Sequence, residues 1–130
     1  MTMPQGLTIW LTGLPGAGKT TLARLLADHL RQQGRSVELL DGDELRRTLT
    51  KDLGFSREDR FANIRRIAFV AASVTRVGGI AIVAAIAPYA EARAEARRMI
   101  RRYVEVYVRC PLTVCMQRDP KGLYAKAQRG

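Results

Sequence analysis

The stretch LTIWLTGLPGAGKTTLARLLADHLRQQG (Leu7–Gly34) decides the fold of this chain. Its first part, LTIWLT, is a β-branched and aromatic run that is typical of a buried strand. Its last part is typical of a helix that ends at Gly34, because leucine recurs at helical spacing. These leucines are Leu22, Leu25, Leu26 and Leu30. Between the two lies GLPGAGKT (Gly13–Thr20), which fits the phosphate-loop pattern G-x-x-x-x-G-K-[ST].

Each position of this loop has a mechanical reason. Glycine permits positive φ, so consecutive backbone N–H groups can turn inward around a phosphate. The helix that follows presents its N-terminus, which favours anions. Lys19 can reach the β- and γ-phosphates of a nucleoside triphosphate, and the Thr20 hydroxyl can bind Mg²⁺. The alternative is a glycine-rich turn with a solvated lysine.

Two carboxylates follow a second predicted strand, SVELL (Ser36–Leu40). A carboxylate beside a phosphate loop can contact Mg²⁺ through water or accept a proton from an acceptor hydroxyl. Asp41 and Asp43 both qualify by position, and we favour Asp43. The alternative is that Asp43 only caps a short helix over Glu44–Leu49, which is a common use of aspartate.

The rest of the chain continues the alternation of strands and helices. Ser56 precedes a long helical stretch, and Asp59 three residues later resembles a capping box. The apolar run GIAIVAAIA (Gly79–Ala87) is typical of a central parallel strand covered on both faces, and YVEVYVRC (Tyr103–Cys110) predicts a fourth strand. One side of the long helix is apolar, and its members are Phe61, Ile64, Ala68, Ala71 and Ala72.

This order of elements predicts βαβ units, and hence an α/β fold with a mostly parallel central sheet and right-handed crossovers. Ligands of such sheets bind beyond the carboxyl ends of the strands. Four loops leave those ends, beginning at Gly13, Asp41, Pro88 and Arg109.

Composition restricts the class of protein. The 130 residues suit one domain, and the net charge of +10 favours an anionic partner, whether nucleic acid, a phosphorylated small molecule or a membrane surface. Cys110 and Cys115 are not spaced as CxxC and there is one histidine, so we expect reduced thiols in a cytoplasmic protein rather than a zinc site. No signal peptide is recognisable, and the longest apolar run is shorter than the about 20 residues that cross a bilayer, so we expect no membrane partner.

The stretch LGFSREDRFANIRR (Leu53–Arg66) carries a second set of candidate residues. Arg60 and Asn63 lie together at i, i+3 of the predicted helix, and Phe55 comes just before it. A guanidinium, an amide and an aromatic plane in one neighbourhood suit a ligand with an anion and a flat base. The alternative is a solvated basic face with Phe55 plugging the core, and we expect Arg65 and Arg66 to be solvated.

Five motifs in this order resemble the adenylylsulfate (APS) kinase family: GLPGAGKT, DGDELR, DLGFSREDRFANIRR, APY and RDPKGLY. The resemblance runs from about Ile9 to the last residue and implies a single domain over residues 1–130 with the three-layer P-loop kinase fold. It implies transfer of the γ-phosphoryl group of ATP, with Mg²⁺, to the 3′-hydroxyl of adenylylsulfate. The product would be 3′-phosphoadenylylsulfate for sulfate assimilation. Family members continue past the end of this chain, so the lid and tail segment would be incomplete here; the resemblance also suggests a homodimer, and a fusion or association with ATP sulfurylase.

The resemblance assigns roles to residues at matching positions. Lys19 and Asp43 would be catalytic, and Thr20 and Asp43 would hold the metal. ATP would contact Gly13, Leu14, Pro15, Gly16, Ala17, Gly18, Lys19, Thr20, Thr21 and Arg118. The acceptor would contact Asp41, Asp43, Arg46, Phe55, Arg60, Asn63, Ile86, Ala87, Lys121, Gly122 and Leu123, with Phe55 stacked on its adenine and the last three in a lid.

One departure and three alternatives accompany this assignment. Ala87 stands where many family members have a serine described as a phosphoserine intermediate, so a covalent phosphoserine at this position is impossible; direct in-line transfer needs none. The chain could be another small-molecule P-loop kinase, or a nucleotide-binding module with little catalysis. Nucleic-acid binding rests on net charge alone, because no strand interleaves basic and aromatic residues.

Overall fold

The computed structural model of the chain describes residues 5–13 and 17–109. Their secondary structure alternates as the sequence predicts. The strands are β1 (Leu7–Thr12), β2 (Val37–Asp41), β3 (Ile80–Ala84) and β4 (Tyr103–Tyr107). The helices are α1 (Lys19–Gln32), α2 (Gly42–Leu45), α3 (Arg57–Arg76) and α4 (Ala90–Met99).

The four strands of this part of the chain form one sheet in the order β2-β3-β1-β4, and every pairing is parallel. The predicted parallel sheet is therefore confirmed. In the register, Ala84 at the end of β3 lies opposite Leu11 of β1 and Asp41 of β2. The carboxyl ends of these strands consequently meet at one edge, which is where ligands of such sheets bind.

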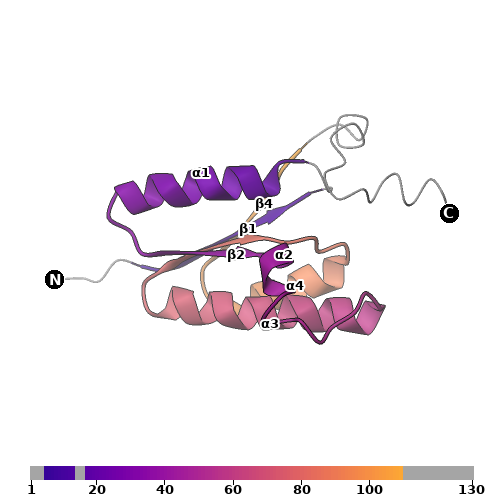
Figure 1. The fold of residues 1–130 in the computed structure, drawn as a ribbon. Helices are drawn as coiled ribbons and strands as arrows, with labels where there is room; N and C mark the ends of the chain where they lie inside the picture. Colours follow the sequence, from indigo (N-terminus) through magenta and orange to yellow (C-terminus); the bar gives the residue numbers. More distant parts are fainter. Residues whose placement is uncertain (1–4, 14–16, 110–130) are drawn as a thin grey trace.

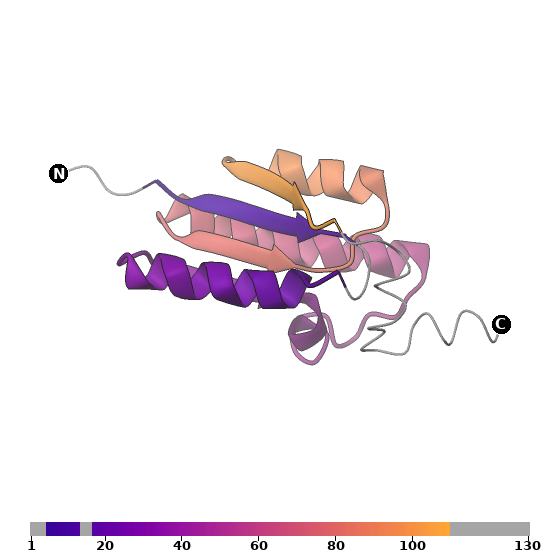
Figure 2. The same cartoon turned by 90° about the horizontal axis from the view of Figure 1, so that it is seen from above.

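Helices cover both faces of the sheet, which makes three layers (Figure 1). The chain moves one way along the sheet from β1 to β2 and the other way from β2 through β3 to β4. Since crossovers are right-handed as a rule, a reversal of direction moves the connecting helix to the opposite face. α1 accordingly lies on one face and α3 and α4 lie on the other, as the view from above in Figure 2 also shows.

Alternate residues of β3 face the two helical layers. Ile80 and Ile82 pack with α1, and Ala81 and Val83 pack with α3 and α4. All five residues of this strand are buried, as the continuous apolar run predicts for a central strand. The predicted apolar side of α3 is also confirmed, with Phe61 partly buried and the other four residues buried.

The leucine spacing predicts the helix α1 correctly, but it does not show which residues of α1 face the sheet. Leu26 and Leu30 pack on the sheet, but Leu22 and Leu25 remain 39% and 64% exposed. The fully buried residues of this helix are Ala23 and Ala27. Small side chains at the contact allow the helix to approach the sheet closely. The alanines therefore face the sheet, whatever the spacing of the leucines.

Two local predictions about helix ends differ from the structure. α2 ends at Leu45 and not at Leu49, because the amide and hydroxyl of Thr50 both donate to the Leu45 carbonyl and turn the chain back. Ser56 does cap α3 by accepting a hydrogen bond from the Asp59 amide over 3.1 Å. The Asp59 carboxylate, however, accepts from the Gly54 amide rather than completing the capping box at Ser56.

Gly6 lets the start of β1 pass close to the end of α3. A Cβ added there would lie 2.0 Å from the Thr75 carbonyl oxygen and 2.8 Å from that of Gly79. Both are backbone atoms, so Gly6→Ala should destabilise the fold by about 2 kcal/mol or more, the scale of an overpacked site. Urea denaturation measures this change, and Gln5→Ala at an exposed position is the control. Equal midpoints for the two variants would contradict this close approach.

Candidate nucleotide and acceptor site

The two described ends of the loop between β1 and α1 have the glycine conformation that the phosphate-loop pattern predicts. Gly13 and Gly18 have φ values of 144° and 96°. Residues with a Cβ atom rarely adopt such positive φ values. Gly18 is also the N-cap residue of α1, where no side chain caps the helix. The amide groups of the first turn therefore remain oriented towards the loop, as anion binding at a helix N-terminus requires.

Lys19 spans this loop. Its Nζ donates a hydrogen bond to the Gly13 carbonyl oxygen over 2.7 Å, and only 8% of the residue is exposed. The ammonium group is thus held at the point where the chain leaves β1. The alternative of a solvated lysine is wrong. Ala17 of this loop is buried, and the predicted loop residues Leu14, Pro15 and Gly16 lie outside the described residues.

The end of β2 is connected to the start of α1 through Asp41. The Thr20 hydroxyl donates to Asp41 Oδ2 over 3.2 Å, and Asp41 Oδ1 accepts from the Asp43 amide over 2.9 Å. Asp41 is therefore the N-cap residue of α2 and is 7% exposed. Asp43 lies in the first turn of α2 with an exposed side chain, as the second residue of the helix and not at its N-cap. The structure assigns the capping role to the other aspartate of the pair.

Phe55 is 69% exposed and does not plug the core. The guanidinium carbon of Arg46 lies 4.4 Å from the centre of its ring, and that of Arg60 lies 5.9 Å away. Arg60 Nε also donates to the Phe55 carbonyl oxygen over 2.9 Å. We call Arg46, Phe55, Arg60 and Asn63 the acceptor cluster. The Phe55 ring lies beside two guanidinium groups, and such a combination suits a ligand that carries both an anion and a flat base.

Asn63 is the buried member of the acceptor cluster, with 5% of the residue exposed. In the part of the chain that the structure describes, its Oδ1 atom has no hydrogen-bond partner. Buried amide oxygens are nearly always paired, because an unpaired one costs free energy. A second unpaired atom, Trp10 Nε1, belongs to the core between the sheet and α3. Asn63 therefore offers an acceptor that a donor group of a ligand could satisfy.

The loop after β3 is fastened from two sides. Arg93 of α4 donates a short hydrogen bond to the carbonyl oxygen of Ala87, which is 7% exposed. Tyr89 packs against Phe61 of α3 with ring centres 5.4 Å apart, and Arg57 lies over both rings. Ile86, the other predicted residue of this loop, is partly buried. The backbone of this loop is thus held in place at the carboxyl end of β3.

Arg65 and Arg66 are exposed to solvent as expected, with 54% and 38% of their side chains exposed, but each also forms an ion pair. Arg65 Nε donates to Glu95 over 2.7 Å, and Arg66 binds both oxygens of Asp52 over 2.6 and 3.0 Å. The hydrogen bond from Arg66 lowers the pKa of Asp52, and that from Arg65 lowers the pKa of Glu95. Sequence reasoning missed these pairs because their members lie 14 and 30 residues apart, without a periodic signal.

The candidate residues gather at one edge of the sheet. Figure 1 shows α2 and the start of α3 at the edge where the strands end and where α1 begins. The predicted residues Arg118, Lys121, Gly122 and Leu123 lie outside the described residues. Within the described ranges, no group of three or more His, Cys, Asp or Glu residues could hold a metal ion. The helices of those ranges include none with the length and apolarity to cross a membrane.

Comparison with known proteins agrees with this geometry. The family model described as adenylylsulphate kinase matches residues 5–130. The adenylyl-sulfate kinase of Rippkaea orientalis is 58% identical over 126 residues, which are 97% of this chain and 70% of that protein. That of Chloroflexus aurantiacus is 58% identical over 129 residues, which are 99% of this chain and 69% of the relative.

A solved structure has the same fold. The APS kinase of Mycobacterium tuberculosis, in complex with AMPPNP and APS, is 47% identical and superposes with a TM-score of 0.92. The match covers 98% of this chain and 76% of that one. Sequence and fold therefore agree, and the chain belongs to the adenylylsulphate kinase family.

Proposed function

We propose that this chain transfers the γ-phosphoryl group of ATP to the 3′-hydroxyl of adenylylsulfate. The products are ADP and 3′-phosphoadenylylsulfate, the activated sulfate of sulfate assimilation. One observation carries the proposal: a phosphate loop and a cluster of cations around an exposed aromatic ring share one edge of the sheet, in a chain of this family. The relatives named above supply the substrate class.

The donor side consists mainly of backbone. Residues 13–21 bind the ATP phosphates through the amides of the loop and of the first turn of α1, with Lys19 at the β- and γ-phosphates. Phosphoryl transfer leaves little covalent work to the protein, so positioning and charge stabilisation dominate. The hydrogen bond that places Lys19 across the loop contributes to both, because it fixes a cation before the nucleotide arrives. We assign Arg118 to the ATP base on the resemblance alone.

The oxygens around Thr20 fit Mg²⁺. The Thr20 hydroxyl and the carboxylates of Asp41 and Asp43 are hard ligands at the start of α1 and the end of β2. Mg²⁺ usually keeps several waters and takes only one or two protein ligands beside substrate phosphates. Two oxygens, from Thr20 and Asp43, therefore suffice without a three-carboxylate site, and Asp41 orients Thr20 by hydrogen bonding. When bound, the ion neutralises charge that develops on the β- and γ-phosphates.

Asp43 is the residue that we assign as base. It accepts the proton of the acceptor 3′-hydroxyl while the oxygen forms a bond to the γ-phosphorus and the bond to the β,γ-bridging oxygen breaks. ADP leaves with the electron pair of the broken bond. Asp41 supports this role because it takes the N-cap position of α2 and accepts a hydrogen bond from the Asp43 amide, which fixes the backbone of Asp43 at the end of β2. Since Ala87 has no hydroxyl, the transfer is direct and involves no phosphoserine.

The acceptor side consists mainly of side chains. Phe55 stacks on the adenine, Arg46 and Arg60 neutralise the phosphosulfate, and Asn63 accepts a hydrogen bond from the ribose. Ile86 and Ala87 contact the acceptor from the loop after β3, which Arg93 and Tyr89 fix. Lys121, Gly122 and Leu123 belong to a lid that excludes water and suppresses hydrolysis of ATP.

We also propose that the chain works as a single cytoplasmic domain with reduced cysteines, completed by a lid and tail. A homodimer and an association with ATP sulfurylase are further proposals from the family resemblance. Size-exclusion chromatography with light scattering tests the dimer: a mass of about twice the 14.5 kDa of this chain supports it, and the monomer mass contradicts it.

Exchange of the acceptor tests the substrate assignment. With Mg-ATP, release of ADP should be at least about a hundredfold more efficient with adenylylsulfate than with a nucleoside, shikimate or gluconate, because a site that pairs specific polar groups rejects ligands without them. The reaction without acceptor measures hydrolysis and is the control. A sugar or nucleoside that works as well as adenylylsulfate would identify another small-molecule kinase. Tight binding of ADP and adenylylsulfate without turnover would identify a binding module.

Lys19→Ala should lower the rate of transfer by at least about a hundredfold, the scale of losing one preorganised charge-stabilising group. The circular dichroism spectrum should remain that of the unchanged chain. Arg24→Ala, at an exposed position of the same helix, is the control and should keep full activity. Near-normal turnover in the Lys19→Ala variant would contradict the role of this loop in binding the phosphates of ATP.

Phe55→Ala should raise the KM for adenylylsulfate by about tenfold, because stacking of a base on an aromatic ring contributes about 1–3 kcal/mol. The KM for ATP should change by less than about twofold, since the ATP base lies elsewhere. Phe69→Ala is the matched control, because Phe69 lies on α3 and is 63% exposed against 69% for Phe55. Equal changes in both KM values would contradict the stacking role.

A further inference from the structure

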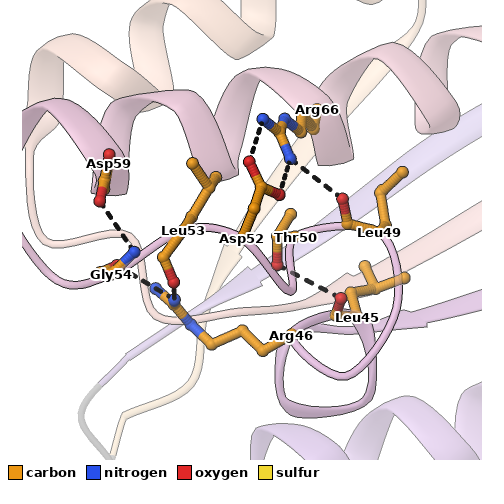
Figure 3. A network of polar contacts seen from close by, with 9 residues as sticks. All are labelled: Leu45, Arg46, Leu49, Thr50, Asp52, Leu53, Gly54, Asp59 and Arg66. Atoms are coloured by element: carbon orange, nitrogen blue, oxygen red, sulfur yellow. Dashed lines mark hydrogen bonds and ion pairs between the residues drawn. The ribbon is translucent and has the colours of Figure 1, made fainter.

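The connection between α2 and α3, residues 46–56, is attached to α3 by side chains at its middle and near its second end (Figure 3). At its middle, the guanidinium of Arg66 binds both carboxylate oxygens of Asp52 and donates to the Leu49 carbonyl oxygen over 3.1 Å. Two residues further on, the Gly54 amide donates to Asp59 over 2.8 Å. The next residue after this second attachment is Phe55, the exposed ring of the acceptor cluster.

Both attachments come from one face of α3. Asp59 and Arg66 are seven residues apart, which is about two helical turns or 10 Å along the axis. Asn63 falls between them on the same stripe, at i+4 from Asp59. The connection is therefore fixed to the helix on either side of the residue whose buried Oδ1 has no partner among the described residues.

Arg46 belongs to the same arrangement from the other end of the connection. Its Nη1 donates to the carbonyl oxygens of Leu53 and Gly54 over 3.4 and 3.2 Å, and its guanidinium lies over the Phe55 ring. A shift of residues 52–54 would therefore move Phe55 and Arg46 together. Two members of the acceptor cluster thus depend on where this short segment lies relative to Asn63 and Arg60 on α3.

We propose that Asp52 and Arg66 are positioning residues of the acceptor site: their bidentate ion pair sets where Phe55 and Arg46 stand relative to Arg60 and Asn63. This inference rests on the proposed function. Neither residue contacts the acceptor in this scheme, and both act through the segment that carries Phe55.

The geometry favours positioning over a role in overall stability. The side chains of Asp52 and Arg66 are 65% and 38% exposed, and exposed ion pairs add little to the free energy of unfolding. A forked pair of hydrogen bonds does, however, fix direction as well as distance, which a single contact does not. Removing it should therefore release the segment without unfolding the sheet, and the effect should appear in acceptor binding.

The experiment compares Asp52→Asn, Arg66→Gln and the double variant in the complete chain, with steady-state kinetics and thermal unfolding for each. The single variants should raise the KM for adenylylsulfate by about fivefold to tenfold, the scale of coupling within one ion-pair network, with less than about a twofold change in the KM for ATP. The double variant should lose little more than either single variant, because the pair is already broken. Arg66→Lys keeps the charge but cannot form the pair of hydrogen bonds, so it should raise the KM for adenylylsulfate about as much as Arg66→Gln does.

Glu95→Gln is the matched control. It breaks the Arg65–Glu95 pair, which is also a partly exposed ion pair of α3 but joins α4 and not the connection. Its KM for adenylylsulfate should stay at the value of the unchanged chain. Equal behaviour of Asp52→Asn and Glu95→Gln would overturn the proposal, as would parallel increases in both KM values or a KM effect that only follows a loss of thermal stability.

The proposed function and the positioning role are tested by different results. Absence of phosphoryl transfer to adenylylsulfate in the unchanged chain overturns the proposed function itself. Efficient transfer in the unchanged chain, with adenylylsulfate KM values preserved in all four variants of Asp52 and Arg66, supports that function and overturns only the positioning role.

Discussion

The parallel register of the strands is the constraint on which the site depends. Asp41, Ala84 and Leu11 lie side by side across three strands, so the chain leaves β2, β3 and β1 at one level. Buried apolar side chains on both faces of β3 fix this register, because a slip of one residue would exchange the two faces. The phosphate loop, Asp43 and the loop at Ala87 then follow within a few residues of that level.

The two sides of the proposed site use different parts of the chain. The donor side relies on backbone geometry, with two glycines at positive φ and a lysine fixed to the first carbonyl of its loop. The acceptor side relies on side chains of α3 and the segment before it, and these need their own supports. The Asp41 carboxylate stands between the two sides, since one oxygen accepts from Thr20 and the other from the amide of Asp43. A shift of the start of α1 or of α2 would therefore change a hydrogen bond to this carboxylate.

Patterns with a period or a fixed local spacing were sufficient to predict much of this arrangement. The phosphate loop, the fully buried third strand and the Ser56 cap are local, and each is where the sequence places it. The leucines of α1 show the limit of such patterns: close helix–sheet contact selects Ala23 and Ala27 for the interior, and size rather than spacing decides this. The exposure of Phe55 likewise follows from how the segment before α3 is held, which no window of sequence contains.

Hydrogen-bonded and ionic pairs that only the folded chain brings together could not be predicted from the sequence. The aspartate that caps α2 could not be distinguished from its neighbour two residues on, because both positions follow the strand and only the turn geometry selects Asp41. The partners of Arg65 and Arg66 come from another helix and from a loop, and a basic helix face gives no sign of them. Positions of this kind follow from tertiary structure, and the acceptor side of the site consists largely of them.

The most direct test of the central claim is a crystal structure of the complete chain with ADP, Mg²⁺ and adenylylsulfate. The account predicts the ADP phosphates within the loop at Lys19, and the adenine of adenylylsulfate on the Phe55 ring. Its 3′-hydroxyl should point to Asp43 and to the position that the γ-phosphoryl group occupies in ATP. Density for adenylylsulfate away from Phe55 and Asn63, or a 3′-hydroxyl turned away from the phosphate loop, would contradict the account.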